Sequence, residues 1–355
     1  MGEHAALYPF TAIVGQNDMK AALCLNAVQP GIGGVLITGE RGTAKTTAVR
    51  ALAGLIGDKR VVELPLNATE DRVVGTLRID ALMEDGARVL EPGILAEADD
   101  GILYVDEVNL LEDHIVDLLL DAAATGMCRV EREGASREYP ARFVLVGTMN
   151  PEEGSLRPQL LDRFGLSVRV DGSLSREERL ELLKRHIEFE ADPESFCTRF
   201  AESERLLAQR IADAADLYPQ VAYPDDAAEL AAGICEAVGV DGYRADIAIM
   251  RTARAAAAFD GRDAVDREDV IAAARFALPH RMKHLPFEEA ELTDDMLARA
   301  VAACEREELG LLPFEEELEP ASNDSANCNM MEPNAEPEVL ASDGTDGSAS
   351  KKAQG

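Results

Sequence analysis

The stretch Gly34–Thr46, which reads Gly-Val-Leu-Ile-Thr-Gly-Glu-Arg-Gly-Thr-Ala-Lys-Thr, places a short apolar run directly before a polar loop that contains glycine. A helical pattern follows and continues to Leu55. A strand, a loop and a helix in this order bring backbone N–H groups and a helix N-terminus together, and glycine lets the backbone approach a ligand closely. The stretch therefore predicts a phosphate-binding loop at Gly39–Thr46, inside a layered α/β domain.

Two side chains of this loop have the chemistry that a nucleoside triphosphate requires. We expect Lys45 to reach the β- and γ-phosphates and the Thr46 hydroxyl to coordinate Mg²⁺. The usual motif has glycine before the lysine, whereas this chain has Ala44. One extra methyl group leaves the lysine, the hydroxyl and the helix in place. Taken alone, the motif is also compatible with a solvated strand–helix turn that carries an incidental lysine.

A second polar cluster follows the apolar run Gly101–Val105 (GILYV), which ends in Asp106 and Glu107. We expect Asp106 to hold Mg²⁺ through water, and Glu107 to polarise the attacking water. The structural alternative is a helix cap by Asp106, or simply an exposed strand end. A phosphate loop followed by this acidic pair is a much stronger signal for ATP hydrolysis than either motif alone.

Two further residues fit the same site. Asn150 ends a third apolar run, where its amide could orient the attacking water, although asparagine is also typical of a turn. The stretch Leu156–Gly165 (LRPQLLDRFG) predicts a short helix that Pro158 starts and that ends near Gly165. Arg163 lies close to that end. It is either stabilised locally by the helix dipole, or it acts as an arginine finger on the γ-phosphate of a neighbouring subunit's ATP.

Short β-like runs alternate with helical stretches between Phe10 and Val170, which predicts an α/β domain with a largely parallel sheet. Near-continuous apolar character in three runs indicates strands covered on both faces. Two segments interrupt the alternation as expected hairpins: Leu77–Leu90, with an Asp-Gly turn, and Arg129–Arg142, whose charges could not be buried cheaply. The β-like runs are Gly34–Thr38, Arg60–Leu64, Gly101–Val105, Phe143–Gly147 and Ser167–Val170.

Beyond Asp171 the pattern becomes helical. Leu174–Glu190 begins with Ser175 as a cap, followed by acidic residues, and Glu202–Cys304 is rich in alanine with a helical period. After Gly310 there is too little apolar content to offset the entropy of ordering. We therefore expect an α/β nucleotide-binding domain over 1–171, a helical linker over 172–204, an all-helical lid over 205–309 and a disordered acidic tail over 310–355.

Composition excludes several classes of partner. The formal net charge is −32, so the chain as a whole repels DNA and anionic membranes. Six cysteines occur without a CxxC pair, which indicates free thiols in a reducing compartment. No apolar run approaches the roughly 18 residues that span a bilayer, and the N-terminus lacks a signal pattern. The composition predicts a soluble cytoplasmic protein that binds neither DNA nor membrane.

The order of phosphate loop, Asp-Glu strand, Asn-ended strand, arginine helix and helical lid resembles the AAA+ ATPases. Within that superfamily the chain is similar to the magnesium chelatase small (I-type) ATPase subunit, from about Pro9 to His280, and Ala44 becomes a family-like feature. The similar segments are Phe10–Gln16 (FTAIVGQ), Asn26–Gly34 (NAVQPGIGG), Gly39–Thr46 (GERGTAKT), Asn150–Gly154 (NPEEG) and Leu156–Leu166 (LRPQLLDRFGL).

The resemblance implies ATP and Mg²⁺ as cofactors, with ATP in the cleft between the α/β domain and the lid. Ile13–Gln16 would lie against the adenine, and Arg244 would be the sensor arginine of the lid, with a plain surface arginine as the alternative. The implied catalytic residues are Lys45, Asp106, Glu107, Asn150, Arg163 and Arg244. The nucleotide would contact Ile13, Val14, Gln16, Gly39, Glu40, Arg41, Gly42, Thr43, Ala44, Lys45, Thr46 and Thr47, and Mg²⁺ would be held by Thr46 and Asp106.

The resemblance also implies an assembly. Members of the family form homo-oligomeric, hexameric rings and dock on a larger AAA+ subunit with an integrin-type domain. They drive a large tetrapyrrole-binding subunit that inserts the metal, as in chlorophyll biosynthesis. The two expected hairpins match the family's insertions, which face partner subunits.

Other functions use the same motor residues. An AAA+ assembly chaperone of the MoxR type and the ATPase subunit of a cobalt chelatase both stay open, because neither differs in those residues. A slow nucleotide switch is disfavoured by the complete set of acid, amide and arginine. A nucleic-acid motor is disfavoured because the second hairpin has nearly balanced charge, with Arg129, Arg132, Arg137 and Arg142 against Glu131, Glu133 and Glu138.

His280 and His284 lie at i, i+4, a spacing that can hold a metal ion. No third ligand is apparent nearby in the sequence, and the prolines Pro279 and Pro286 confine the pair to a short segment. We therefore interpret these histidines as structural and expect the substrate metal and the tetrapyrrole to bind another subunit.

Overall fold

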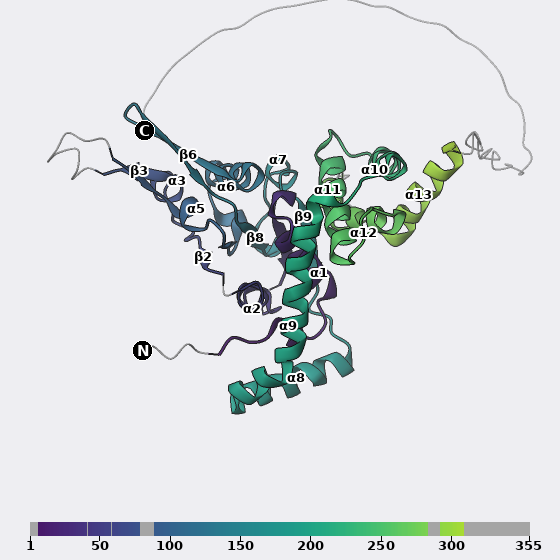
Figure 1. The fold of residues 1–355 in the computed structure, drawn as a ribbon, viewed down its shortest axis with the longest axis horizontal. Coiled ribbons are helices and arrows are strands. Elements are labelled where there is room, and N and C mark those ends of the chain that lie inside the picture. Colours follow the sequence, from purple (N-terminus) through teal and green to yellow (C-terminus); the bar gives the residue numbers. More distant parts are fainter. Residues whose placement is uncertain (1–5, 41, 58, 79–88, 283–291, 309–355) are drawn as a thin grey trace, which may run out of the picture. The chain divides into compact units, whose positions relative to one another are not determined.

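The computed structural model describes residues 6–40, 42–57, 59–78, 89–282 and 292–308; the predicted tail over 310–355 lies outside the described residues. Five strands form a parallel sheet in the order β2–β5–β8–β1–β9 (Figure 1). They correspond to the five β-like runs of the sequence, with ends that differ by one or two residues. The strands are β1 (Val35–Gly39), β2 (Val61–Glu63), β5 (Ile102–Val105), β8 (Val144–Met149) and β9 (Leu166–Val170).

The pleat of β1 divides the apolar core between the two faces of the sheet. Val35 and Ile37 belong to one hydrophobic cluster, and Leu36 between them belongs to the other. Such alternation follows from the two-residue period of a strand. Every residue of β5 and β8 is buried, as expected for central parallel strands that helices cover on both sides. The first cluster continues into the C-terminal helices, so the sheet and these helices share one apolar core.

Helices flank the sheet and form the C-terminal part of the described chain, where α9 packs against α1 and α11 (Figure 1). Within the described ranges, no helix combines the length and the apolar character needed to cross a bilayer. The helices are α1 (Asn17–Val28), α2 (Lys45–Leu55), α3 (Glu70–Val74), α5 (Ile94–Glu97), α6 (Asp113–Thr125), α7 (Pro158–Leu161), α8 (Arg176–Ala191), α9 (Pro193–Leu217), α10 (Asp225–Val238), α11 (Arg244–Phe259), α12 (Arg267–Ala277) and α13 (Asp294–Glu308). Single 3₁₀ turns are η1 (Phe10–Ala12), η2 (Pro30–Ile32), η3 (Val108–Leu110), η4 (Pro151–Glu153) and η5 (Tyr218–Gln220).

The start of α8 and the end of α10 have the caps that their sequences favour. Ser175 caps α8 and forms a capping box with Glu178, because each side chain accepts a hydrogen bond from the other's backbone N–H. Gly239 ends α10 in the left-handed conformation. By contrast, α9 runs without interruption across residues 204 and 205. The predicted limit between linker and lid falls inside this helix, and the domain limits stay a prediction.

Both expected hairpins have paired flanks. In the first, β3 (Gly75–Leu77) pairs with β4 (Leu90–Pro92), and the connection 79–88 lies outside the described residues. In the second, β6 (Met127–Arg132) pairs with β7 (Ala135–Pro140) through Glu133 and Gly134, both at positive φ. Two positive φ values match the tight turn that suits the twist of paired strands. The charged residues of this hairpin are mostly exposed, as predicted.

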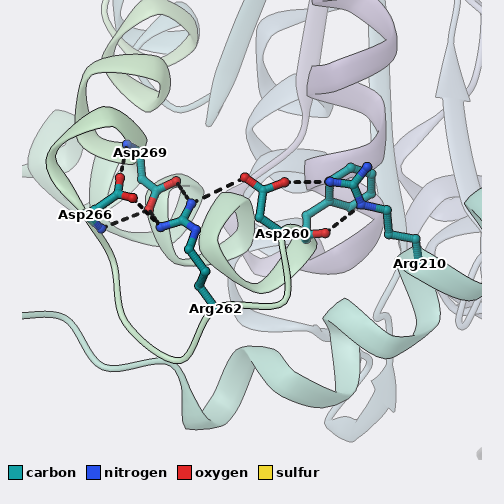
Figure 2. A network of polar contacts seen from close by, with 6 residues as sticks. Arg210, Asp260, Arg262, Asp266 and Asp269 are labelled. Carbon is teal, nitrogen blue, oxygen red and sulfur yellow. Dashed lines mark hydrogen bonds and ion pairs between the residues drawn. The ribbon is translucent and has the colours of Figure 1, made fainter.

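A polar network fastens the α11–α12 connection to α9 (Figure 2). Arg210 of α9 donates to Asp260 at 2.6 Å. Arg262 donates to both carboxylate oxygens of Asp269, at 2.5 and 2.6 Å, and to Asp266 at 2.6 Å. Asp269 is only 5% exposed, and the positive charge of Arg262 offsets the free-energy cost of burying its carboxylate. Hydrogen bonds to Asp269 raise the pKa of Arg262, and the guanidinium stays charged.

Arg262→Ala is expected to lower the free energy of unfolding by about 3 kcal/mol, because it leaves the Asp269 carboxylate buried without its partner. Urea denaturation followed by circular dichroism measures this difference. Arg205→Ala is the matched control, since Arg205 also binds one carboxylate through two nitrogens, that of Glu202, but is 63% exposed. Its loss should change stability by no more than about 0.5 kcal/mol. Equal effects of the two substitutions would contradict a special role for the Asp269 pair.

Candidate nucleotide site

A cavity of about 710 Å³ opens where strands β1, β5 and β8 end. Its size is in the range of sites for drug-sized ligands. Most of the predicted site residues line this one space, although they come from distant parts of the sequence. Those residues are Ile13, Val14, Gln16, Gly42, Thr43, Ala44, Lys45, Thr46, Thr47, Asp106, Glu107 and Asn150. Gly39 and Glu40 are not among the lining residues, and Arg41 lies outside the described residues.

Glycine is required where β1 enters the loop. Gly39 has φ of 156°, and a Cβ atom there would lie 2.3 Å from the carbonyl oxygen of Val170 on the adjacent strand. Any larger residue would separate β1 from β9 at the point where the phosphate loop starts. The sequence motif therefore reflects close packing of two strands here, as well as access to a ligand.

Lys45 folds back onto the loop that precedes it. Its ammonium group donates to the carbonyl oxygens of Gly39 and, at 3.0 Å, Glu40. Burial lowers the pKa of Lys45, and the negative charges of nearby carboxylates oppose this shift. The cation therefore lies within electrostatic reach of the acidic pair that ends β5. The carboxylates are Asp106, Glu107 and Glu153.

A chain of hydroxyl groups connects the loop with the acidic strand end. The Thr46 hydroxyl lies 3.0 Å from the Tyr104 hydroxyl, which donates to Asp106 Oδ1 at 2.9 Å. The Thr148 hydroxyl donates to the same carboxylate oxygen at 2.6 Å. Burial and the hydrogen bond to Asp106 raise the pKa of Tyr104 to about 12, so it stays protonated.

The oxygen donors of this chain fit Mg²⁺. A threonine hydroxyl and a carboxylate are the hard ligands that Mg²⁺ prefers, with phosphate oxygens and water completing the shell. Thr46 and Asp106 are both hydrogen-bonded to the Tyr104 hydroxyl, which places the two predicted Mg²⁺ ligands in the same part of the cavity. In the described part of the chain there is no cluster of three or more His, Cys, Asp or Glu side chains suited to a metal.

Hydrogen bonds from backbone N–H groups hold Glu107 and Asn150 in position. The Glu107 N–H donates to the Thr148 hydroxyl at 3.1 Å. Asn150 is buried, and its Oδ1 accepts from the N–H of Glu152 at 3.3 Å, so it caps η4. The turn function considered for Asn150 is therefore present, and the residue also faces the cavity.

Left-handed backbone is concentrated at this site. Gln16, Ala44 and Glu107 have φ of 51°, 62° and 54°, and all three line the cavity. Each such residue costs of order 1 kcal/mol when it carries a side chain. Strain of this kind persists only where the surrounding structure holds it, and here it is found in three residues that line one cavity.

Ala44→Gly is expected to stabilise the fold by about 1 kcal/mol, because glycine adopts left-handed φ without strain. The urea midpoint should rise. Ala21→Gly is the control, since Ala21 is exposed within the right-handed helix α1, where glycine costs about 1 kcal/mol. The strain assigned to Ala44 is refuted if both substitutions lower the midpoint.

The second wall of the cavity differs from the prediction. We expected the lid to form it, but the apolar wall comes from the segment 172–204 and the N-terminal segment, and none of the described residues 205–308 lines the cavity. Tyr8 and Phe189 meet edge to face with ring centroids 5.1 Å apart, and this packing holds α8 against the N-terminal segment. The residues are Tyr8, Leu174, Leu182, His186 and Phe189.

Arg163 and Arg244 lie outside the cavity and close to each other in the structure. The helix expected to end near Gly165 ends at Leu161 instead. Arg163 follows in a turn and pairs with two carboxylates of α6, rather than with a helix C-terminus; it is 29% exposed. Arg244 begins α11 as predicted and donates to Asp162 at 2.7 Å, so it contacts the residue before Arg163. The α6 carboxylates are Asp117, at 3.3 Å, and Asp121, at 2.6 Å.

His280 has a structural contact. Its Nε2 atom lies 2.9 Å from the carbonyl oxygen of Phe164, so Nε2 carries the proton, because a carbonyl only accepts. Burial lowers the pKa of His280 to about 3 and keeps it neutral. His284 lies outside the described residues.

Tyr104 and Thr148 were missed by sequence reasoning, although a signal for both existed. Tyr104 stands two residues before Asp106, and Thr148 stands two residues before Asn150. Alternate residues of a strand share a face, so each polar side chain points the same way as the predicted functional residue that follows it.

Comparison with known proteins agrees with this geometry. The AAA domain family (dynein-related subfamily) matches residues 34–164, and the AAA lid domain family matches residues 228–304. A proposed ATPase of Cytophaga hutchinsonii has a similar solved structure, with a TM-score of 0.58, 21% identity and coverage of 83% of this chain and 90% of that chain. The fold and the cavity thus define an ATPase of the AAA+ class.

Two curated relatives identify the family of this chain within the AAA+ class. The magnesium-chelatase subunit ChlI homolog of Methanocaldococcus jannaschii is 48% identical over 331 residues, covering 83% of this chain and 91% of the relative. The magnesium-chelatase 38 kDa subunit of Rhodobacter capsulatus is 46% identical over 319 residues, covering 81% and 91%. The chain belongs to the family of magnesium-chelatase ATPase subunits of the ChlI type.

Proposed function

We propose that this chain is the ATP-hydrolysing motor subunit of a magnesium-chelatase-type complex, and that its ATPase cycle drives metal insertion into a tetrapyrrole by a partner subunit. One observation supports the motor function above all others. The phosphate loop, the acidic pair and Asn150 line a single cavity, although the sequence separates them widely.

Within one subunit, we assign binding and positioning to residues that line the cavity or join its hydroxyl chain. Ile13, Val14 and Gln16 would contact the adenine, and Lys45 would leave the loop carbonyls to bind phosphate oxygens. Thr46 and Asp106 would hold Mg²⁺, which neutralises phosphate charge when it is bound. Glu107 would accept a proton from the attacking water, and Asn150 would orient that water.

The charge that completes the reaction would come from a neighbouring subunit. Arg163 and Arg244 lie together at the α7–β9 turn and outside their own cavity, which fits a surface that faces the next subunit's nucleotide. An arginine delivered in trans stabilises the charge on the transferred phosphoryl group. A homo-oligomeric ring, which we propose to be a hexamer, would bring these parts together, and the isolated chain would hydrolyse ATP poorly.

Family membership supports a proposal for the partners. The curated relatives are named as subunits of magnesium chelatase, and a subunit implies further chains. We propose that the ring docks on an AAA+ subunit with an integrin-type domain and acts on a large tetrapyrrole-binding subunit. The metal and the tetrapyrrole would be substrates of that large subunit.

Reconstitution tests the function directly. The chain is mixed with the two partner subunits encoded by the same organism, a porphyrin, Mg²⁺ and ATP, and metalloporphyrin formation is followed by absorbance. Metal insertion that needs both this chain and ATP is the expected result, with Lys45→Ala as the inactive control. Insertion of Co²⁺ but not Mg²⁺ would assign the chain to a cobalt chelatase. Full ATPase activity without any metal insertion would favour a MoxR-type chaperone.

A further inference from the structure

The turn between α7 and β9, residues 162–165, is bound by a single arginine of the helical part. Arg281 donates to the carbonyl oxygen of Asp162 from Nε at 3.2 Å and from Nη2 at 2.9 Å. It also donates from Nη1 to the carbonyl oxygen of Gly165 at 3.1 Å, and from Nη2 to that of Phe164. One guanidinium therefore binds every carbonyl group of the turn except that of its second residue.

Burying the Arg281 guanidinium at this contact has a cost in free energy. The Arg281 side chain is 3% exposed, and burial lowers its pKa to about 10. Removing a guanidinium from water is unfavourable unless its donors find acceptors. The planar fork of arginine is suited to several acceptors at once, and the turn provides them. His280 adds a hydrogen bond to the Phe164 carbonyl from the adjacent position.

Arg163 is consequently held at two places by two different parts of the molecule. Its guanidinium pairs with carboxylates of α6. The backbone on both sides of Arg163 is bound by Arg281, and the carboxylate of Asp162 lies between Arg244 at 2.7 Å and Arg281 at 3.4 Å. The position of the helical part thus fixes the path of the chain at Arg163, while α6 fixes the end of its side chain.

We propose that Arg281 is a positioning residue that sets the direction in which Arg163 is presented to the cavity of the next subunit. The inference rests on the proposed function of Arg163 in trans. Arg281 is not among the residues that line its own cavity, so its effect would pass through Arg163. A reacting group displaced by about 1 Å can lower a rate about 10²-fold, so the loss should appear in kcat.

Arg281→Met keeps an unbranched apolar stem in place of the arginine stem and removes the guanidinium donors. The expected result is a kcat of the assembled ring that is about 10- to 100-fold lower, with an unchanged KM for ATP. Binding of a fluorescent ATP analogue by the chain should also be unchanged. Arg254→Met is the matched control, because Arg254 of α11 likewise donates to backbone carbonyls, those of Tyr218 and Val221, but does not contact the turn.

A double-mutant cycle separates positioning from general stability. If Arg281 acts through Arg163, then Arg281→Met should cause no further loss of kcat in the Arg163→Ala background. A purely structural contribution would lower kcat in both backgrounds. Arg281→Lys keeps a cation at the site but cannot span the three carbonyls, so it should give an intermediate kcat. The same cycle with Arg281→Lys applies if the methionine variant does not fold.

The possible outcomes are distinguishable. An unchanged kcat of Arg281→Met, or an equal loss in both backgrounds, overturns the positioning function and leaves Arg163 in its proposed place. An unchanged kcat of the single variant Arg163→Ala overturns the proposed trans function itself.

Discussion

Replacing Arg163 with alanine is expected to lower the kcat of the assembled ring about 10³-fold, while the chain binds ATP as before. This difference between kcat and binding is expected because Arg163 and the nucleotide cavity of the same chain lie apart. Arg163 does not line the cavity of its own chain, so ATP bound in that cavity would not contact it. Phosphoryl transfer in the next subunit would lose the cation that stabilises charge on the transferred group.

Steady-state ATPase rates measured over a range of protein concentrations, with nucleotide titrations in parallel, test this prediction. The parent chain should become more active per subunit as the ring assembles, and Arg163→Ala should not. Arg299→Ala is the control, because Arg299 on α13 is also an arginine paired with aspartate, here with Asp295 alone, and is 72% exposed. It should keep the parent rate.

Mixing gives a second test of action in trans. An Arg163→Ala subunit has an intact cavity, and a Lys45→Ala subunit has an intact Arg163. Together they should hydrolyse ATP faster than either variant alone. Some subunit interfaces then combine the intact cavity of one variant with the intact Arg163 of the other. An Arg163→Ala chain that has lost ATP affinity would instead place Arg163 in its own nucleotide site.

Glu107→Gln is expected to abolish turnover, with kcat lower by about 10²- to 10⁴-fold, and to leave ATP bound. The amide has the size of the carboxylate but cannot take a proton from water. The position of residue 107 should be kept, because it depends on a backbone N–H that donates to Thr148, and glutamine retains that group.

Nucleotide titration and phosphate release distinguish binding from chemistry in this variant. Glu152→Gln serves as the control, since it makes the same change of charge on an exposed residue that does not line the cavity. Only Glu107→Gln should accumulate bound ATP. Turnover at the parent rate would remove Glu107 from the mechanism and direct attention to Asp106.

The local motifs were predictable because each is encoded by consecutive residues. Gly34–Thr46 predicts a strand, a loop and a helix, and β1 and α2 occupy those positions. The parallel order of the strands follows from their apolar character and the helices between them. Because parallel strands end at one edge of a sheet, the predicted polar residues at those ends meet in one cavity.

Errors occurred where the outcome depends on contacts between distant segments. The cavity wall that we assigned to the lid is formed by α8 and Tyr8, because aromatic packing of Tyr8 on Phe189 holds that helix in place. The helix before Arg163 stops early, at Leu161. The carbonyl groups of Asp162 and Phe164, which follow this early end, accept hydrogen bonds from Arg281.

The sequence by itself determined the class of the protein: a phosphate loop, an acidic strand end and a family resemblance all follow from short runs of residues. Only the tertiary structure decided where the functional side chains lie relative to the cavity and to one another. It placed Arg163 and Arg244 together, outside the cavity, and seated Arg281 under the turn that carries Arg163. The physical reason is that a buried guanidinium is stable only where carbonyl groups converge, and residues 162 and 281 converge by folding, not by any pattern in the chain between them.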